Sequence, residues 1–431
     1  MMHLTLTRRR LLAGAGMAAT LTTLAGHQPG SAQEASGSFR LLRAKPGIAH
    51  LRGPDQKATE IWGYDGSVPG PALRVRRGEE VRVRLANELA EPTALHWHGV
   101  RVPNAMDGVP HLTQAPVAPG TSFDYRFVAP DAGTFWYRAF ASAQLDRGLA
   151  GALVVAESPA VAVDREVVLV LNDWQLEPAA KDGAEHLTVN GIPLFDVPVK
   201  TNERARLRLI NGCRRRPMGL RFDQHRATVM AIDGQPAEPF VARDGRVALG
   251  PGNRLDVFVD MILAPGSSAS VLAIGPRSET PIIRFLYEGG APTRGAPLDD
   301  PKPLPSNGLP ARIELRNAVR AELALDAGTR QETGAAGYGP PLFSTKRGRT
   351  VVLAVANRSA DLAAVHLHGH HARLLDNLDD GWKPFWLDTM MVAAQQTARL
   401  AFVADNPGKW LVEGSLLGRQ EAGVNTWFEV I

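Results

Sequence analysis

The sequence predicts an all-β protein made of three Greek-key β-sandwich domains. Its 431 residues exceed what one compact core usually holds, so several domains are expected. Short stretches of alternating apolar and polar residues, typical of β-strands, are separated by turns drawn from 42 glycines and 32 prolines. A strand-like segment that occurs three times along the chain gives the number of domains.

The repeated segment is clearest at residues 78–87 and 348–357, where a turn leads into a strand that ends at an asparagine. In both copies, nine further residues reach a His-x-His-Gly sequence, and the two 22-residue segments align without a gap. A third copy at residues 202–211 has Leu220 and Phe222 where the outer copies have histidines. Three copies of one segment indicate three related domains.

The repeat and the composition together predict the division of the chain. We expect domains at residues 36–160, 161–290 and 311–431. A proline-rich stretch at residues 291–310 is expected to link the second domain to the third.

Residues 1–32 are similar to a twin-arginine signal peptide. Arg8, Arg9 and Arg10 precede an apolar stretch that ends near Ala25, and a small-residue cleavage site follows at residues 30–32. Such a leader predicts export to the periplasm in the folded state. No later apolar run reaches the roughly 18 residues needed to cross a bilayer, so no transmembrane segment is expected.

Charge gives no indication of a polyanionic partner. The chain has 48 basic and 44 acidic residues, and without the three leader arginines the count becomes 45 against 44, a net charge of +1. Binding to nucleic acid or to a membrane surface is therefore not expected. The triplet at residues 214–216 is predicted to be a solvated turn, and the single cysteine, Cys213, a packed thiol at the end of a strand.

Each His-x-His pair places two imidazoles on one face of a strand, because alternate residues of a strand point the same way. His96 and His98 form the first pair, and His366 and His368 form the second. If the two pairs face each other across a domain interface, four imidazoles converge, a donor set that suits copper or zinc. The alternative is that they are structural histidines, hydrogen-bonded within a polar interface.

Six motifs stand out along the chain. They are His96-Trp97-His98-Gly99, the segment from Asp107 to Gln114, the segment from Pro251 to Val257, the segment from His366 to His370, Asp388-Thr389, and the segment from Ala404 to Trp410. In type, order and spacing they resemble the motifs of the multicopper oxidases, the family of laccase-like enzymes. The resemblance covers essentially everything after the leader, and it implies three cupredoxin domains, a blue copper in the third, and a three-copper cluster between the first and third.

The resemblance also shows where this chain departs from the family. His96 and His366 stand at the type 2 copper positions, and His98 and His368 stand at two of the six type 3 positions. The other four type 3 positions hold Arg138, Phe140, Glu413 and Ser415, and the blue copper positions hold Ala363, Gly414, Arg419 and Val424. Cys213 lies in a different domain from the missing thiolate. The resemblance therefore implies that four-electron reduction of oxygen is lost, because the family's mechanism needs all four coppers.

A residual site remains in this interpretation. Asp107 matches a family acid that lies near the type 2 copper. Glu413 is expected to enter the same cavity either as an oxygen ligand or as the ion-pair partner of Arg138. Of His370 and His371, at most one is expected to face the cavity, because neighbouring residues of a strand point to opposite faces. His111 is expected to lie in a loop.

Two functions follow from these residues. The first is a non-catalytic periplasmic scaffold or binding protein, a monomer with an unidentified periplasmic protein partner. The family has a precedent, a periplasmic cell-division stabiliser that resembles a copper oxidase without copper. The alternative is a copper-binding protein or weak mononuclear oxidoreductase that holds one copper ion mainly at His96 and His366. A full complement of four coppers is not expected.

Overall fold

The structure is a computed structural model that describes residues 38–176, 186–326, 338–376, 381–382, 385–417 and 423–431. Residues Phe39–Ile431 form one compact unit, to which everything below refers. Within the described residues, the helical segments are the short helix α1 (Ser142–Asp146) and two single 3₁₀ turns, η1 (Asn104–Met106) and η2 (Arg243–Gly245). Strands make up the remaining regular structure, so the predicted all-β class is confirmed. The leader at residues 1–32 lies outside the described residues.

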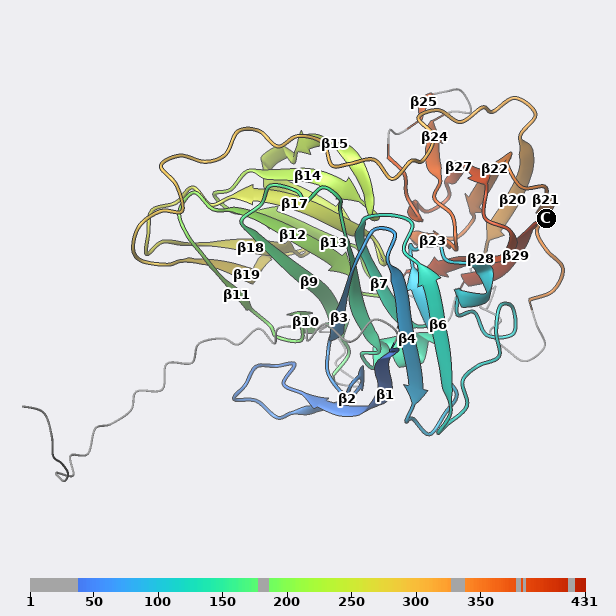
Figure 1. Cartoon of the computed structure of the whole chain (residues 1–431), viewed down its shortest axis with the longest axis horizontal. Helices are drawn as coiled ribbons and strands as arrows, with labels where there is room; N and C mark the ends of the chain where they lie inside the picture. The colour runs from blue at the N-terminus through green and yellow to red at the C-terminus, as the bar shows by residue number, and fades with distance from the viewer. Residues whose placement is uncertain (1–37, 177–185, 327–337, 377–380, 383–384, 418–422) are drawn as a thin grey trace, which may run out of the picture. The chain divides into compact units, whose positions relative to one another are not determined.

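The first β-sandwich contains strands β1 to β8, drawn in blue to teal in Figure 1. Its two sheets have the orders β2-β1-β4-β6 and β3-β8-β7-β5. The strand bounds are β1 Arg40–Ala49, β2 Thr59–Tyr64, β3 Gly70–Arg76, β4 Glu80–Asn87, β5 Leu95–His98, β6 Ser122–Val128, β7 Gly133–Ala139 and β8 Ala150–Ala156.

The second β-sandwich contains strands β9 to β19, green to yellow in Figure 1. Its sheets have the orders β10-β9-β12-β17-β14-β15 and β11-β19-β18-β13-β16. The strand bounds are β9 Arg165–Trp174, β10 His186–Val189, β11 Phe195–Val199, β12 Arg204–Asn211, β13 Met218–Phe222, β14 Ala227–Ile232, β15 Gln235–Val241, β16 Arg246–Leu249, β17 Arg254–Asp260, β18 Ser268–Ile274 and β19 Glu279–Tyr287.

The third β-sandwich contains strands β20 to β29, orange to red in Figure 1. Its sheets have the orders β20-β22-β27-β24-β25 and β21-β29-β28-β23-β26. The strand bounds are β20 Val319–Leu325, β21 Ser344–Thr345, β22 Arg349–Asn357, β23 Ala363–Leu367, β24 Arg373–Asp376, β25 Gly381–Trp382, β26 Thr389–Val392, β27 Thr397–Ala404, β28 Gly408–Leu416 and β29 Gly423–Val430.

The repeated segment occupies the same place in every sandwich, as β4, β12 and β22. Each copy pairs in parallel with the first strand of its sandwich and antiparallel with a later one. Each ends at an asparagine (Asn87, Asn211 or Asn357) whose side-chain oxygen accepts a hydrogen bond from the backbone N–H two residues later. The side-chain amide then donates to a carbonyl oxygen four or five residues later and to a second carbonyl oxygen much farther along the chain. One amide therefore organises the same loop in all three domains.

The second sandwich packs against the first through a buried ionic cluster. Arg206 and Arg208 of β12 alternate with apolar residues that face the core, so the arginines lie on the opposite face of the strand. Both guanidiniums contact Asp256 of β17, and Arg206 also makes a two-point ion pair with Glu157, at 2.6 and 3.0 Å. Arg208 donates to the Thr134 hydroxyl of β7. This cluster joins the two sandwiches.

Among the described residues, no helix has the length and apolar character required to cross a bilayer.

Candidate metal centre

Two equivalent strands bring four buried imidazoles together. His96 and His98 lie on β5, while His366 lies on β23 and His368 directly follows it. The Nε2 atoms of His96 and His366 are 3.1 Å apart. The rings of His98 and His366 stack with their centroids 3.6 Å apart, and those of His96 and His368 are 4.0 Å apart. The two His-x-His pairs therefore meet face to face.

The tautomers of His96 and His366 follow from their backbone contacts. The Nδ1 atom of His96 lies 2.9 Å from the carbonyl oxygen of Asp107, and that of His366 lies 3.0 Å from the carbonyl oxygen of Asp388. A carbonyl oxygen can only accept, so both Nδ1 atoms carry the proton. The neutral rings then present bare lone pairs at Nε2, directed at each other across 3.1 Å.

Both of these rings are held neutral. Burial, followed by the neighbouring His368, lowers the pKa of His96 to about 3, although Asp107 acts in the opposite direction. Burial likewise lowers the pKa of His366 to about 4 against the opposing effect of Asp388. Two facing lone pairs repel unless a proton or a cation lies between them. Neutral imidazole is the form that binds metals, so this donor pair fits one copper or zinc ion.

Asp107 is placed against β5 by a tight loop. Gly108 has φ +80°, and a Cβ atom there would lie 1.8 Å from the carbonyl oxygen of Leu95, so only glycine fits. This close approach lets the Asp107 carbonyl oxygen reach His96 and its carboxylate reach His368, where Oδ2 lies 2.9 Å from Nδ1. Asp107 therefore bridges the two sandwiches through one imidazole of each.

Arg138 and Glu413 enter the cluster from the adjacent strands. Arg138 of β7 stands across from His96, and Glu413 of β28 stands across from His366. The guanidinium Nη2 donates to Glu413 Oε2 at 2.5 Å, so the two residues form an ion pair. The Nε–H of Arg138 also donates to Nδ1 of His98 at 3.4 Å. Since a guanidinium cannot accept, it engages the lone pair that a metal would need at that ring.

Acidic and basic side chains alternate along this side of the cluster, in the order Asp107, His368, Glu413 and Arg138. His368 lies between the two carboxylates, 2.9 Å from Asp107 and 3.7 Å from Glu413. Burial lowers the pKa of His368, but the two carboxylates outweigh it and raise that pKa above its usual value. Burial raises the pKa of Glu413, but Arg138 and then His368 outweigh it and hold that pKa well below its usual value.

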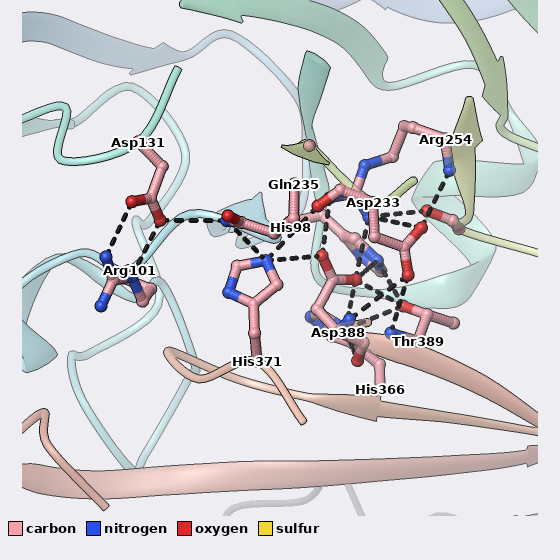
Figure 2. Close-up of polar contacts among 12 residues, drawn as sticks. His98, Arg101, Asp131, Asp233, Gln235, Arg254, His366, His371, Asp388 and Thr389 are labelled. Carbon is pink, nitrogen blue, oxygen red and sulfur yellow. Dashed lines mark hydrogen bonds and ion pairs between the residues drawn. The ribbon is translucent and has the colours of Figure 1, made fainter. Parts of the chain in front are cut away.

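A second layer of buried residues, without an assigned role in the sequence, fixes His98 and His366 (Figure 2). The Thr389 hydroxyl lies 2.9 Å from Nε2 of His98 and 3.0 Å from Nδ1 of His366. Asp388 accepts a two-point ion pair from Arg254 of β17 at 2.9 and 2.6 Å. The second sandwich therefore anchors the ligand-bearing face of the third.

Asp233 completes this layer. It accepts backbone N–H groups of Arg254 at 3.0 Å and of Asp388 and Thr389 at 3.3 Å each. Burial, and then repulsion from Asp388, raises the pKa of Asp233 to about 6. The Asp388-Thr389 motif was visible in the sequence. The contacts of Asp388 with Arg254 and Asp233 were not visible, because they join the third sandwich to the second.

His370 and His371 separate as expected of neighbouring residues. His371 joins the layer in Figure 2, with Nε2 3.5 Å from the Asp388 carboxylate. His370 packs among the rings of Phe402, Trp410 and Phe428, and burial lowers its pKa to about 4. His111 is exposed in a turn.

The remaining aligned positions carry no metal-binding side chain. Phe140 packs with apolar neighbours, and Ala363, Gly414 and Val424 lie on β23, β28 and β29. A Cβ atom at Gly414 would lie 2.7 Å from Cδ2 of Leu325, so that side chain occupies the space beside the glycine. Arg419 lies outside the described residues.

The expectation that residues 214–216 form a solvated turn is wrong for its first two arginines. Arg214 donates to both carboxylate oxygens of Asp146 at 2.9 Å, and Arg215 donates to Asp146 at 2.7 Å. Both side chains are half-buried because helix α1 carries Asp146 over the turn. Cys213 is buried as predicted, with Sγ 3.7 Å from the carbonyl oxygen of Leu171.

Comparisons with known proteins agree with this fold. Three family profiles, each described as multicopper oxidase, match residues 49–160, 165–268 and 310–431. The multicopper oxidase MmcO of Mycobacterium tuberculosis is 27% identical over 97% of this chain and 91% of its own length.

Two solved structures extend the comparison. A multicopper oxidase from Pseudomonas thermotolerans is 32% identical, with a TM-score of 0.81 over 91% of this chain and 99% of its own. Lac15 from a marine microbial metagenome is 31% identical, with a TM-score of 0.79 over 91% of this chain and 100% of its own. The three-sandwich chain with paired His-x-His motifs is a member of the multicopper oxidase family.

Proposed function

We propose that this multicopper-oxidase-like protein has lost oxidase chemistry and serves as an exported periplasmic scaffold or binding protein. The observation that carries the proposal is the ion pair between Arg138 and Glu413, 2.5 Å apart, at positions where the family places type 3 copper ligands. A fixed guanidinium charge repels a divalent ion at such range. The same guanidinium engages the Nδ1 lone pair of His98.

The blue copper positions support the same conclusion. A blue copper site needs a thiolate and two imidazoles, and Ala363, Gly414 and Val424 supply none of these donor atoms. Leu325 fills the space in which a cysteine side chain would begin. Without the thiolate, the protein lacks the family's entry point for electrons.

One copper ion does fit the residues that remain. The Nε2 atoms of His96 and His366 are unprotonated, buried and 3.1 Å apart, so both can serve one ion. Copper bound there would supply one-electron redox chemistry. The chain itself holds the two rings through the backbone carbonyls of Asp107 and Asp388, which fixes the tautomer that binds metal. The second candidate function, a copper-binding protein or weak mononuclear oxidoreductase, rests on this pair.

The organisation expected from the sequence completes the proposal. Residues 1–32 act as a twin-arginine leader, and residues 36–160, 161–290 and 311–431 form the three domains, with the linker at residues 291–310. The mature protein acts as a monomer that binds another periplasmic protein.

Copper stoichiometry tests the proposal. The mature protein is loaded with excess cuprous ion without oxygen, dialysed, and measured by elemental analysis beside a variant with His96→Ala and His366→Ala. We expect no more than one copper per chain in the wild type, none in the variant, and no oxygen uptake with a phenolic reductant. No copper in either protein favours the pure scaffold. About four coppers, with blue colour and steady oxygen uptake, would overturn the proposal.

A further inference from the structure

A pocket of about 60 Å³ opens beside the histidine cluster, on the side of Arg138. All three sandwiches contribute to its lining: β7 and helix α1 from the first, the loop after β12 from the second, and strands β23, β26 and β28 from the third. The groups that matter for the argument are Trp136, Arg138, Arg214 and Glu413.

The lining is rich in hydrogen-bond donors. A guanidinium has five N–H groups. Arg138 directs three of these to His98, Ala139 and Glu413, which leaves two without a recorded acceptor in the described part of the chain. Arg214 donates two N–H groups to Asp146, and its other three have no acceptor within the described ranges. Trp136 adds a buried indole N–H that has no hydrogen-bond partner among the residues that the structure describes. A buried donor of this kind calls for an acceptor.

Acceptors in the pocket are few by comparison. Glu413 is the one carboxylate among the described lining residues, and Arg138 already holds it. Arg138 and Glu413 neutralise each other, whereas Arg214 shares the carboxylate of Asp146 with Arg215, so one positive charge remains in excess beside the pocket. That charge disfavours a cation and favours an anion.

We propose that this pocket binds a small planar oxyanion, a carboxylate such as formate or acetate or an inorganic ion such as nitrate or bicarbonate. Guanidiniums recognise planar O–C–O and O–N–O groups through two parallel hydrogen bonds. The volume limits the ligand, since one water needs about 10 to 15 Å³ of such space and the pocket holds only a few waters. An ion of about four heavy atoms fits, and a nucleotide does not.

The anion site does not depend on a bound metal, because every donor named above belongs to the chain. Its failure and the failure of the proposed function can therefore be told apart. Calorimetric titration of chelator-treated mature protein measures the anion alone, whereas copper stoichiometry measures the histidine pair alone.

Arg214→Gln and Arg215→Gln provide a matched pair of variants. Both arginines bind Asp146, but only Arg214 lines the pocket. Chelator-treated wild type and both variants are titrated with sodium formate, acetate, nitrate and bicarbonate at constant ionic strength, with sodium chloride as the reference. Circular dichroism checks that each variant is folded.

We expect at least one oxyanion to bind the wild type. Arg214→Gln should lower the affinity for that oxyanion at least tenfold, whereas the affinity of Arg215→Gln should stay within twofold of the wild-type value. A preference for formate and acetate assigns a carboxylate ligand, and a preference for nitrate and bicarbonate assigns an inorganic one. The proposal is overturned if no oxyanion binds the metal-free wild type, if chloride gives the same response, or if both variants lose affinity equally. If a variant fails to fold, the titration of metal-free wild type with oxyanions and chloride still supports or overturns the proposal.

Discussion

Replacing one member of the ion pair between Arg138 and Glu413 should lower the free energy of unfolding more than replacing both members together. The two side chains are 6% and 14% exposed, so either charge left alone would remain largely out of water. The perturbations are Glu413→Gln, Arg138→Met, and the double replacement Arg138→Met with Glu413→Leu. Glu413→Gln leaves Arg138 without this carboxylate, Arg138→Met leaves Glu413 with His368 at 3.7 Å, and the double replacement removes both charges.

The magnitude follows from the contact distance. At 2.5 Å, the attraction between unit charges is about 7 kcal/mol at an effective dielectric constant of 20. Desolvation costs several kcal/mol for each ion, so the intact pair contributes little net stability. Each single replacement removes the attraction but keeps one desolvation cost, and should lower the free energy of unfolding by about 3 to 5 kcal/mol. The double replacement should lie within about 2 kcal/mol of wild type.

Urea unfolding of metal-free mature protein, followed by circular dichroism and tryptophan fluorescence, measures these differences. Asp124→Asn is the control, because it breaks a two-point ion pair with Arg84 that is largely exposed. Exposed pairs contribute little, so the control should stay close to wild type. The reasoning fails if the single replacements cost no more than the control. It also fails if the double replacement costs as much as the two single ones together.

Four further outcomes are expected. Asp256 has its pKa lowered because Arg206 and Arg208 outweigh the opposing effect of burial. Because the pKa of Asp256 is lower in the folded state, its carboxylate stabilises the fold at pH values above the unfolded-state pKa of about 4. This stabilisation is lost as the pH falls through the folded-state pKa, so Asp256→Asn should flatten the acid branch of a plot of unfolding free energy against pH. An unchanged acid branch would contradict this. Gly414→Cys should crowd Leu325 and lower the free energy of unfolding by about 1 to 3 kcal/mol. The copper-loaded variant should show no copper–thiolate absorption band, and a blue variant would contradict the loss of the blue copper site. Thr389→Val should weaken copper binding about 10- to 100-fold in a competition titration, because the hydroxyl orients two imidazoles, and wild-type affinity would argue against that role. Lysine replacement of the leader's first two arginines should stop periplasmic accumulation in cell fractionation, and normal accumulation would exclude a twin-arginine leader.

The fold could be predicted from the sequence because its signals are local and repeated. The strand before each asparagine, the nine-residue interval and the His-x-His pairs can all be read along one stretch of chain. The pairing of His96 with Arg138, and of His366 with Glu413, also follows once two neighbouring strands are aligned. Local alternation and an internal repeat therefore predicted the class of fold and the strands that carry the cluster.

The supporting layer could not be predicted, since the contacts that connect different sandwiches in it join residues more than a hundred positions apart. Arg254 reaches Asp388 across 134 residues. The prediction of a solvated turn at Arg214 was wrong for a similar reason. Its partner Asp146 lies 68 residues away, on the short helix α1 of the first sandwich. An arginine triplet in a turn gives no sign of an acid that another domain holds over it.

The ionic cluster on β12 indicates that the second sandwich would be less stable as a separate domain. Arg206 and Arg208 are each 1% exposed, and part of their neutralisation comes from Glu157, while Thr134 of the first sandwich accepts from Arg208. Cutting the chain near residue 160 would remove those partners and expose the two guanidiniums to water, with Asp256 and Glu166 as their remaining carboxylates. Moving the second sandwich of this protein into another chain would therefore require the first sandwich to be moved with it.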